Sequence, residues 1–280
     1  MFKFLWHKLP FTGDPAPIVN LLPMNGTIAP DTRTGKSLNL SGLEDSLRKA
    51  FTVGSPRAVI LSINSPGGSP VQSRMILARA RELAEKHKLP LITHIEDVGA
   101  SGGYMLALAG DEIYADPFAI VGSIGVIAGG FGFPDALEKL GIERRVYTAG
   151  DHKGQLDPFR PESPRDVRRL EDLLEKSHKG FVGVVKERRG ERLKGSDDTL
   201  FNGDFWLAED AKELGLIDGV EDMRAMLKRR FGDRVKIRPI PADKKGMLAK
   251  LMGASLERVI GPDAILGAIE RKSLWSRFGR

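Results

Sequence analysis

One local pattern occurs twice in the chain: an apolar run rich in β-branched residues, then a glycine-rich turn, then a helix-forming segment. In the first copy, residues 58–63 (AVILSI) precede NSPGGSP, and in the second, residues 89–95 (LPLITHI) precede EDVGASGGYMLALAG. Such runs predict buried strands. Strands that alternate with helices in this way predict an α/β protein with parallel strand pairing. The same turns are the first candidates for a functional site.

Hydrophobic periodicity and capping residues predict the other elements. The run Ser41-Gly-Leu-Glu44 fits a capping box that opens a helix, and Ser69 is expected to cap the next helix, with Gln72 completing its box. A long amphipathic helix is expected from Pro164. The expected strands are 18–22, 58–63, 89–95, 112–115, 144–148 and 235–240, and the remaining helices follow Ser101 or span 210–214 and 221–230.

Composition excludes several kinds of chemistry. The chain has no cysteine, which rules out disulfides, thiolate nucleophiles and cysteine-bound metals. Its five histidines are scattered and no HExxH motif occurs, so we expect neither a metal nor a cofactor. The net charge of +6 is mild and concentrated around 165–193 and 224–250, a pattern typical of solvated helix faces, so no nucleic-acid partner is expected.

Membrane insertion is not expected, because no run approaches the roughly 18–20 apolar residues of a transmembrane helix. The chain is therefore predicted to be cytoplasmic. Its two ends, residues 1–11 and 246–278, combine apolar and basic residues and are the candidates for peripheral contact with the inner membrane face.

Ser101 lies at the predicted strand-to-helix junction, where unpaired N–H groups and the helix dipole favour negative charge. A serine that merely caps the helix is an alternative explanation. The run Gly99–Gly103 also satisfies G-x-S-x-G, the nucleophile elbow of α/β hydrolases, but His152 and His178 follow no convincing acid loop. A dinucleotide-binding turn is disfavoured because Met105 stands where a third glycine would help.

A lysine that activates Ser101 is the third interpretation, and it requires burial and hydrogen bonding to lower the lysine pKa. Lys153 stands out because it follows a predicted buried strand and precedes Asp157-Pro158-Phe159, which should fix the backbone. The turn 64–68 strengthens this interpretation. Two glycine loops on adjacent strands can direct N–H groups at one point and form an oxyanion hole.

An ordered set of motifs resembles the signal peptide peptidase A (protease IV) and SohB-type serine peptidases. The resemblance covers about residues 16–240 and implies a Clp-protease/crotonase-like fold, an α/β superhelix of strand–helix units with parallel sheets. It also implies a Ser/Lys dyad in place of a Ser/His/Asp triad. The matching motifs are NSPGGS (64–69), GASGGYMLA (99–107), VGSIGV (121–126), GDHKGQLDPFRP (150–161) and FNGDFWLAEDAKELGLIDGV (201–220).

The resemblance assigns a role to each matching residue. Ser101 would be the nucleophile, and Lys153 the general base that takes its proton and returns it to the leaving amine. Ser123 would orient the lysine. The N–H groups of Gly68 and Gly102 would form the oxyanion hole, and Gly67 would shape the turn.

These assignments predict a serine endopeptidase that hydrolyses peptides or unfolded and membrane-derived polypeptides through an acyl-enzyme. The resemblance also implies a homo-oligomeric ring. The expected organisation is an N-terminal segment (1–16), a Ser/Lys peptidase domain (17–240) and a C-terminal helical extension (241–280). Two alternatives remain: an acyl-CoA hydratase or thioesterase on the same fold, and a non-catalytic scaffold at the membrane surface.

Overall fold

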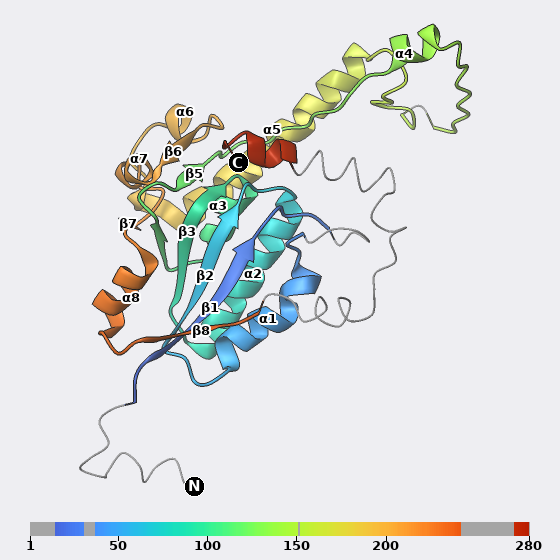
Figure 1. The fold of residues 1–280 in the computed structure, drawn as a ribbon. Helices are drawn as coiled ribbons and strands as arrows, with labels where there is room; N and C mark the ends of the chain where they lie inside the picture. Colours follow the sequence, from blue (N-terminus) through green and yellow to red (C-terminus); the bar gives the residue numbers. More distant parts are fainter. Residues whose placement is uncertain (1–14, 31–36, 151, 242–271, 280) are drawn as a thin grey trace, which may run out of the picture.

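The computed structural model describes residues 15–30, 37–150, 152–241 and 272–279. Its centre is a sheet with the strand order β6-β5-β3-β2-β1-β8, to which β4 adds beside β3 and β7 beside β4 (Figure 1). The neighbouring strands run parallel, except that β5 and β6 are antiparallel. The strands are β1 (Ile18–Asn25), β2 (Ala58–Ser65), β3 (Leu91–Ala100), β4 (Glu112–Ala115), β5 (Ile120–Gly122), β6 (Phe205–Leu207), β7 (Gly219–Val220) and β8 (Lys236–Pro239).

Helices cover both faces of this sheet (Figure 1). The larger core joins one face to helices α1, α2, α3 and α5, and the smaller core joins the other face to α8. The two central strands β2 and β3 are almost continuously buried, which explains why their first halves are mostly apolar and do not alternate with polar residues. The helices are α1 (Leu40–Thr52), α2 (Pro70–His87), α3 (Gly102–Ala107), α4 (Pro134–Lys139), α5 (Pro164–Arg189), α6 (Asp197–Leu200), α7 (Ala208–Glu213) and α8 (Met223–Phe231).

The predicted α/β architecture with parallel pairing is confirmed. Five of the six predicted strands form, as β1, β2, β3, β4 and β8. Ser69 caps α2 as predicted: its side chain accepts a hydrogen bond from Gln72 N–H, and Pro70 opens the helix. Gly215, at φ +76°, follows α7 in the left-handed conformation typical of a residue that ends a helix.

Two predicted caps differ from the structure. The N-cap of α1 is Asn39 in place of Ser41, because the Asn39 side chain accepts a hydrogen bond from Gly42 N–H. Gln72 does not complete a box with Ser69. Its side-chain oxygen accepts a hydrogen bond from Leu40 N–H instead, and so joins the N-termini of α1 and α2.

The predicted strand at 144–148 is wrong. These residues belong to a segment, 126–150 and 152–163, that leaves the body and carries α4 at its far end; we call it the arm (Figure 1). Residues 144–148 make no strand pairing with any described residue, and Tyr147 is 90% exposed. The alternating sequence suits a strand, but no neighbouring strand lies beside it.

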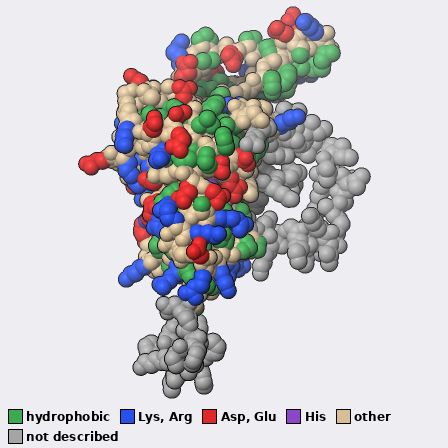
Figure 2. Space-filling model, turned by 60° about the vertical axis from the view of Figure 1, so that its left-hand side comes forward, with side chains coloured by type: hydrophobic (Ala, Val, Ile, Leu, Met, Phe, Trp, Pro, Cys, Tyr) green, Lys and Arg blue, Asp and Glu red, His purple; other side chains and the backbone are tan. Residues whose placement is uncertain are grey.

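The arm is held together by its own contacts. Phe133 N–H donates to the Pro158 carbonyl at 2.6 Å, the Phe133 and Phe159 rings lie 5.5 Å apart, and Arg144 pairs with Asp157. Apolar side chains nevertheless remain on its surface, where they gather at the top of the space-filling view (Figure 2). The exposed ones are Ile127, Phe131, Phe133, Leu140, Ile142, Tyr147, Leu156 and Phe159.

The C-terminal residues 272–279 return to the body. Residues 272–276 are helical, and Phe278 packs with Val98 and Ala100 at the end of β3. Its ring also meets the Phe205 ring edge-on at 5.3 Å. The predicted extension is therefore described only in this part. The predicted membrane-contact segment 1–11 and residues 242–271 lie outside the described residues. None of the described helices combines the length and apolarity needed to cross a membrane.

Candidate active site

The two glycine turns predicted to meet do meet. The turn after β2 and the turn after β3 lie at the carboxyl ends of adjacent parallel strands, where Ser65 pairs with Gly99. A Cβ built on Gly67 would lie 2.7 Å from the Gly102 nitrogen, and one built on Gly102 would lie 3.3 Å from the Gly68 nitrogen. Side chains at these positions would force the loops apart, and glycine lets them approach.

The main chain of Ile28 fixes the first turn. Ile28 N–H donates to the Gly67 carbonyl at 2.9 Å, and Ser69 N–H donates to the Ile28 carbonyl at 2.7 Å. Gly68 lies between Gly67 and Ser69, and its N–H is not used in the hydrogen bonds to Ile28. Gly68 itself has φ +139°, and a Cβ there would lie 2.0 Å from the Ile28 oxygen. The sequence analysis missed Ile28, although its place just after β1, the neighbour of β2, could have indicated it.

Ser101 does not act as a helix cap. It occupies the N-cap position of α3 at φ +52° and ψ −122°, and its side chain makes no capping hydrogen bond. Its own N–H donates to the Gly122 carbonyl at 2.7 Å. Backbone of this kind is costly for a residue with a Cβ, and residues held in such conformations cluster at functional sites. The geometry therefore disfavours the capping alternative.

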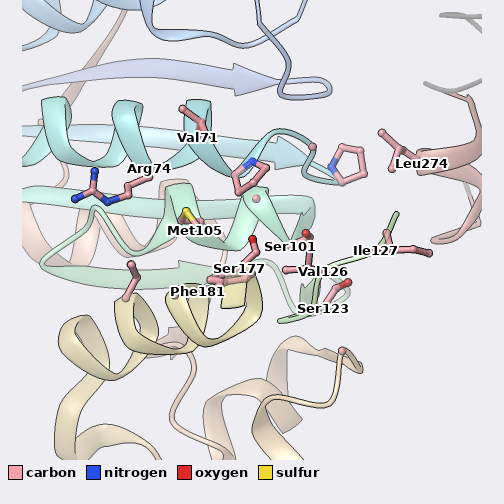
Figure 3. A pocket seen from close by; sticks show the side chains of 18 of the residues that line it. Val71, Arg74, Ser101, Met105, Ser123, Val126, Ile127, Ser177, Phe181 and Leu274 are labelled. Carbon is pink, nitrogen blue, oxygen red and sulfur yellow. The ribbon is translucent and has the colours of Figure 1, made fainter. Parts of the chain in front are cut away.

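Ser101 opens into a cavity of about 770 Å³. The N–H of Gly102, the first residue of α3, has no acceptor within its own helix, so it is free to point at a ligand. Gly68 and Gly102 line the same cavity. Ser123 also lines it, near Ser101 (Figure 3). Ser123 is 5% exposed, has φ +52°, and is held by a hydrogen bond from its N–H to the Asp204 carbonyl. The cavity thus brings together the hydroxyls of Ser101 and Ser123 and the backbone of Gly68 and Gly102.

The walls of the cavity are mostly apolar and come from segments distant in sequence. Met105 of α3 and Phe181 of α5 lie beside Ser101, and Val71 comes from the first turn of α2 (Figure 3). Leu274 closes the other end. The sequence analysis predicted an amphipathic helix from Pro164, and α5 buries Phe181 and Val185, but it did not predict that this helix also forms a cavity wall.

Lys153 does not lie in this cavity. It is exposed on the arm, in a turn in which its N–H donates to the Gly150 carbonyl at 3.2 Å. The predicted setting of this lysine, a loop just after a buried strand, is therefore wrong, since residues 144–148 form no strand. Within a single chain the structure brings together Ser101, Gly67, Gly68, Gly102 and Ser123, and leaves Lys153 apart.

The described residues contain no group of three or more His, Asp or Glu side chains placed to hold a metal ion. Among the histidines that the structure describes, one is buried: His94 on β3 is 3% exposed, and its Nε2 contacts the Glu221 carbonyl at 3.0 Å. Burial lowers the pKa of His94 below its ordinary value of 6.5. It lies outside the cavity of Ser101.

Comparison with known proteins places this arrangement in a family. Residues 83–233, more than half of the chain, match the model of peptidase family S49. The chain belongs to peptidase family S49. The resemblance to SppA- and SohB-type peptidases is thereby confirmed, and the match includes Ser101, Ser123 and Lys153.

Relatives of this S49 chain are longer proteins. It is 47% identical over 87% of its length to a Brucella abortus protein named Na(+)/H(+) antiporter NhaA, covering 34% of that protein. It is 28% identical over 85% of its length to the Arabidopsis thaliana protein named serine protease SPPA, chloroplastic, again covering 34%. The chain therefore spans about a third of the length of these two relatives.

Solved structures confirm the fold. Two structures of the 1510-N membrane-bound stomatin-specific protease, a serine-to-alanine mutant and a lysine-to-alanine mutant with a substrate peptide, superpose with TM-scores of 0.50 and 0.51. They cover 81% and 85% of this chain and 99% and 98% of their own chains. At 17% and 16% identity, this likeness concerns the fold alone.

Proposed function

We propose that this S49 chain is a serine endopeptidase that cleaves peptides or unfolded polypeptides through an acyl-enzyme on Ser101. The observation that carries the proposal is the meeting of three features in one cavity. Ser101 is held in a rare backbone conformation without a capping hydrogen bond. Gly68 and Gly102 lie so close together that a Cβ built on Gly102 would be 3.3 Å from the Gly68 nitrogen, and both line the cavity with Ser101. The family match supports hydrolysis of peptide bonds.

The chemistry follows from these positions. Ser101 Oγ attacks the carbonyl carbon of the scissile bond, and its proton passes to a general base. The N–H groups of Gly68 and Gly102 stabilise the negative oxygen of the tetrahedral intermediate. Collapse of the intermediate breaks the C–N bond, with the base returning the proton to the leaving amine. Water then hydrolyses the acyl-enzyme by the same steps.

We assign the general base to Lys153, delivered by the arm of a second copy of the chain. Two observations support this assignment. Lys153 lies outside the cavity of its own chain, on an arm whose exposed apolar side chains, such as Phe131 and Tyr147, would be covered by a neighbouring subunit. The hydroxyl of Ser123 would then hold the neutral amine in place. A ring of such copies would contain one complete site at each contact.

Mixing two inactive variants tests the assignment. The assay measures cleavage of an unfolded protein by mass spectrometry. Ser101→Ala and Lys153→Ala are each expected to abolish this cleavage. When the two variants are mixed, sites that combine an intact Ser101 with an intact Lys153 form, and part of the wild-type activity should return. Lys139→Ala, on the same arm, is the matched control and should remain active.

Each other outcome has a definite meaning. If the two variants stay silent when mixed, although sizing shows mixed assemblies, the base comes from the same chain through movement of the arm. If Lys153→Ala cleaves like wild type, the dyad is wrong. If Ser101→Ala cleaves, the peptidase proposal is wrong; turnover of an acyl-CoA by that variant would favour the hydratase alternative, and no turnover of either substrate by wild type would favour the scaffold.

We further propose polypeptides near a membrane surface as the substrates. The Brucella abortus relative carries the name of an Na(+)/H(+) antiporter, which supports this substrate class. Vesicle flotation of the full chain and of a variant lacking residues 1–11 would test peripheral contact. Loss of flotation in the shortened protein is the expected result.

A further inference from the structure

The cavity of Ser101 carries positive charge only. Among its lining residues, two are charged, Arg74 and Arg277, and both are arginines. None of the described residues that line it is an aspartate, a glutamate or a histidine. A cavity lined with one sign of charge and apolar walls concentrates ligands of the opposite sign.

Arg74 differs from the other arginines of α2. Arg79 pairs with Glu44 at 2.5 Å and Glu82 at 2.6 Å, and Arg81 pairs with Asp111 at 2.6 Å. Within the described part of the chain, Arg74 makes no ion pair with any carboxylate, although it lies on the same helix and is exposed to the cavity side. Its guanidinium is therefore available for a carboxylate of another molecule, which it can bind through two parallel hydrogen bonds.

The position of Arg74 relative to Ser101 determines which part of a bound polypeptide it can contact. Arg74 follows Val71 by one helical turn, and Met105 lies between Arg74 and Ser101 in the close-up (Figure 3). Arg74 and Leu274 are seen on opposite sides of Ser101 (Figure 3). A bound polypeptide would thus meet apolar contacts next to the nucleophile and a guanidinium beyond them, on the α2 side.

We propose that Arg74 is a specificity-determining residue, which binds a carboxylate of the substrate a short apolar stretch away from the bond that Ser101 cleaves. The carboxylate can come from an acidic side chain or from a free peptide C-terminus. This proposal rests on the proposed function for the cleavage step, but binding of the acidic ligand can be measured separately.

The first experiment measures binding without cleavage. Full-length Ser101→Ala protein is titrated against fluorescent peptides that are apolar at the centre and carry Glu or Gln at each flanking position in turn, with free or amidated C-termini. A carboxylate at the favoured position should tighten binding about three- to tenfold over its neutral partner, as expected for a partly exposed arginine–carboxylate pair. In 0.5 M NaCl this ratio should shrink, because exposed charges are screened.

Three further variants locate the effect. Added to Ser101→Ala, Arg74→Gln should bring the acidic-to-neutral ratio close to one. Arg168→Gln, which removes the same charge from an exposed site on α5 outside the cavity, should leave the ratio unchanged. The assignment of Arg74 is wrong if the acidic-to-neutral ratio falls to one in Arg277→Gln instead, or if it is unchanged in Arg74→Gln. It is also wrong if no peptide in the series binds.

Cleavage by wild type separates this inference from the proposed function. Selective binding without cleavage would leave the Arg74 assignment standing and overturn the peptidase. Cleavage with equal kcat/KM for Glu and Gln peptides would keep the peptidase and overturn Arg74. The expected result is cleavage with the same acidic preference, lost in Arg74→Gln.

Discussion

Ser101 and Ser123 share one unusual backbone conformation, each with φ +52°, and both line the same cavity. They lie at the ends of neighbouring strands, since Ser101 follows β3, Ser123 follows β5, and these strands pair. Residues with a Cβ seldom adopt positive φ. The fold therefore holds two hydroxyls toward one space at the expense of backbone strain, and this strain can be measured.

Replacing Ser101 by glycine or by alanine separates strain from chemistry. Both variants lack the hydroxyl and should lose cleavage by at least about a thousandfold. Ser101→Gly should be more stable than Ser101→Ala by about 1 kcal/mol, because only glycine relaxes at this φ. Urea unfolding of the two variants checks the difference, and equal stability would mean that the strain is absent.

Gly67→Ala should disable the site while the protein still folds. The new Cβ would lie 2.7 Å from the Gly102 nitrogen at φ +99°, so it would displace an oxyanion donor. We expect a loss of kcat of about a hundredfold or more, and a stability cost of about 1–3 kcal/mol. The control is Gly129→Ala, whose Cβ would meet nothing within 4 Å. If both variants have wild-type kcat, the loop does not supply the oxyanion hole.

Stability should fall in mild acid because of His94. Burial lowers its pKa, so the folded protein binds a proton less readily than the unfolded chain does. The contribution is fully present above the unfolded pKa near 6.5, and is lost as pH falls below that value toward the lower folded pKa. The nearby carboxylates of Glu96, Asp116 and Asp222 oppose the shift and reduce its size.

Denaturant unfolding between pH 8 and pH 5 tests this prediction. His94→Gln, whose side-chain amide can still donate to the Glu221 carbonyl, should show a flatter pH dependence than wild type over this range. A variant with the same slope as wild type would show that other groups carry the pH dependence.

Asp218→Asn should destabilise the protein through Arg189. The Arg189 side chain is 2% exposed and donates to both oxygens of Asp218, at 2.8 and 3.0 Å. Neutralising the partner leaves a buried guanidinium uncompensated, which costs about 3 kcal/mol. Arg145→Gln removes one member of an exposed pair and should change stability by less than about 0.5 kcal/mol. Thermal unfolding of both variants makes the comparison.

The sequence predicted the sheet and the meeting of the glycine turns because both depend on local signals. Buried strands such as 58–63 and 89–95 show mostly apolar runs, and parallel pairing brings the turns that follow them together. The strand predicted at 144–148 failed because a strand needs a neighbour as well as a suitable sequence. The pattern of a single segment contains no information about whether a partner lies beside it.

The cavity walls could not be predicted for a related reason. Val71, Phe181 and Leu274 come from segments far apart in the chain, and only their docking in space shows that they face Ser101. The charge of the cavity follows from that docking too, since an arginine such as Arg74 looks in the sequence like any solvated helix residue. The approach of the Ser101 turn to the turn at Gly67 and Gly68 could be predicted, because turn geometry depends on a few adjacent residues.

The distance of Lys153 from its own Ser101 has a consequence for newly synthesised chains. Under the assignment above, a copy leaving the ribosome holds its nucleophile without its base, and cannot cut the proteins around it. The number of complete sites would rise more steeply than the amount of protein, so a cell could keep the proposed activity low by keeping few copies of the chain.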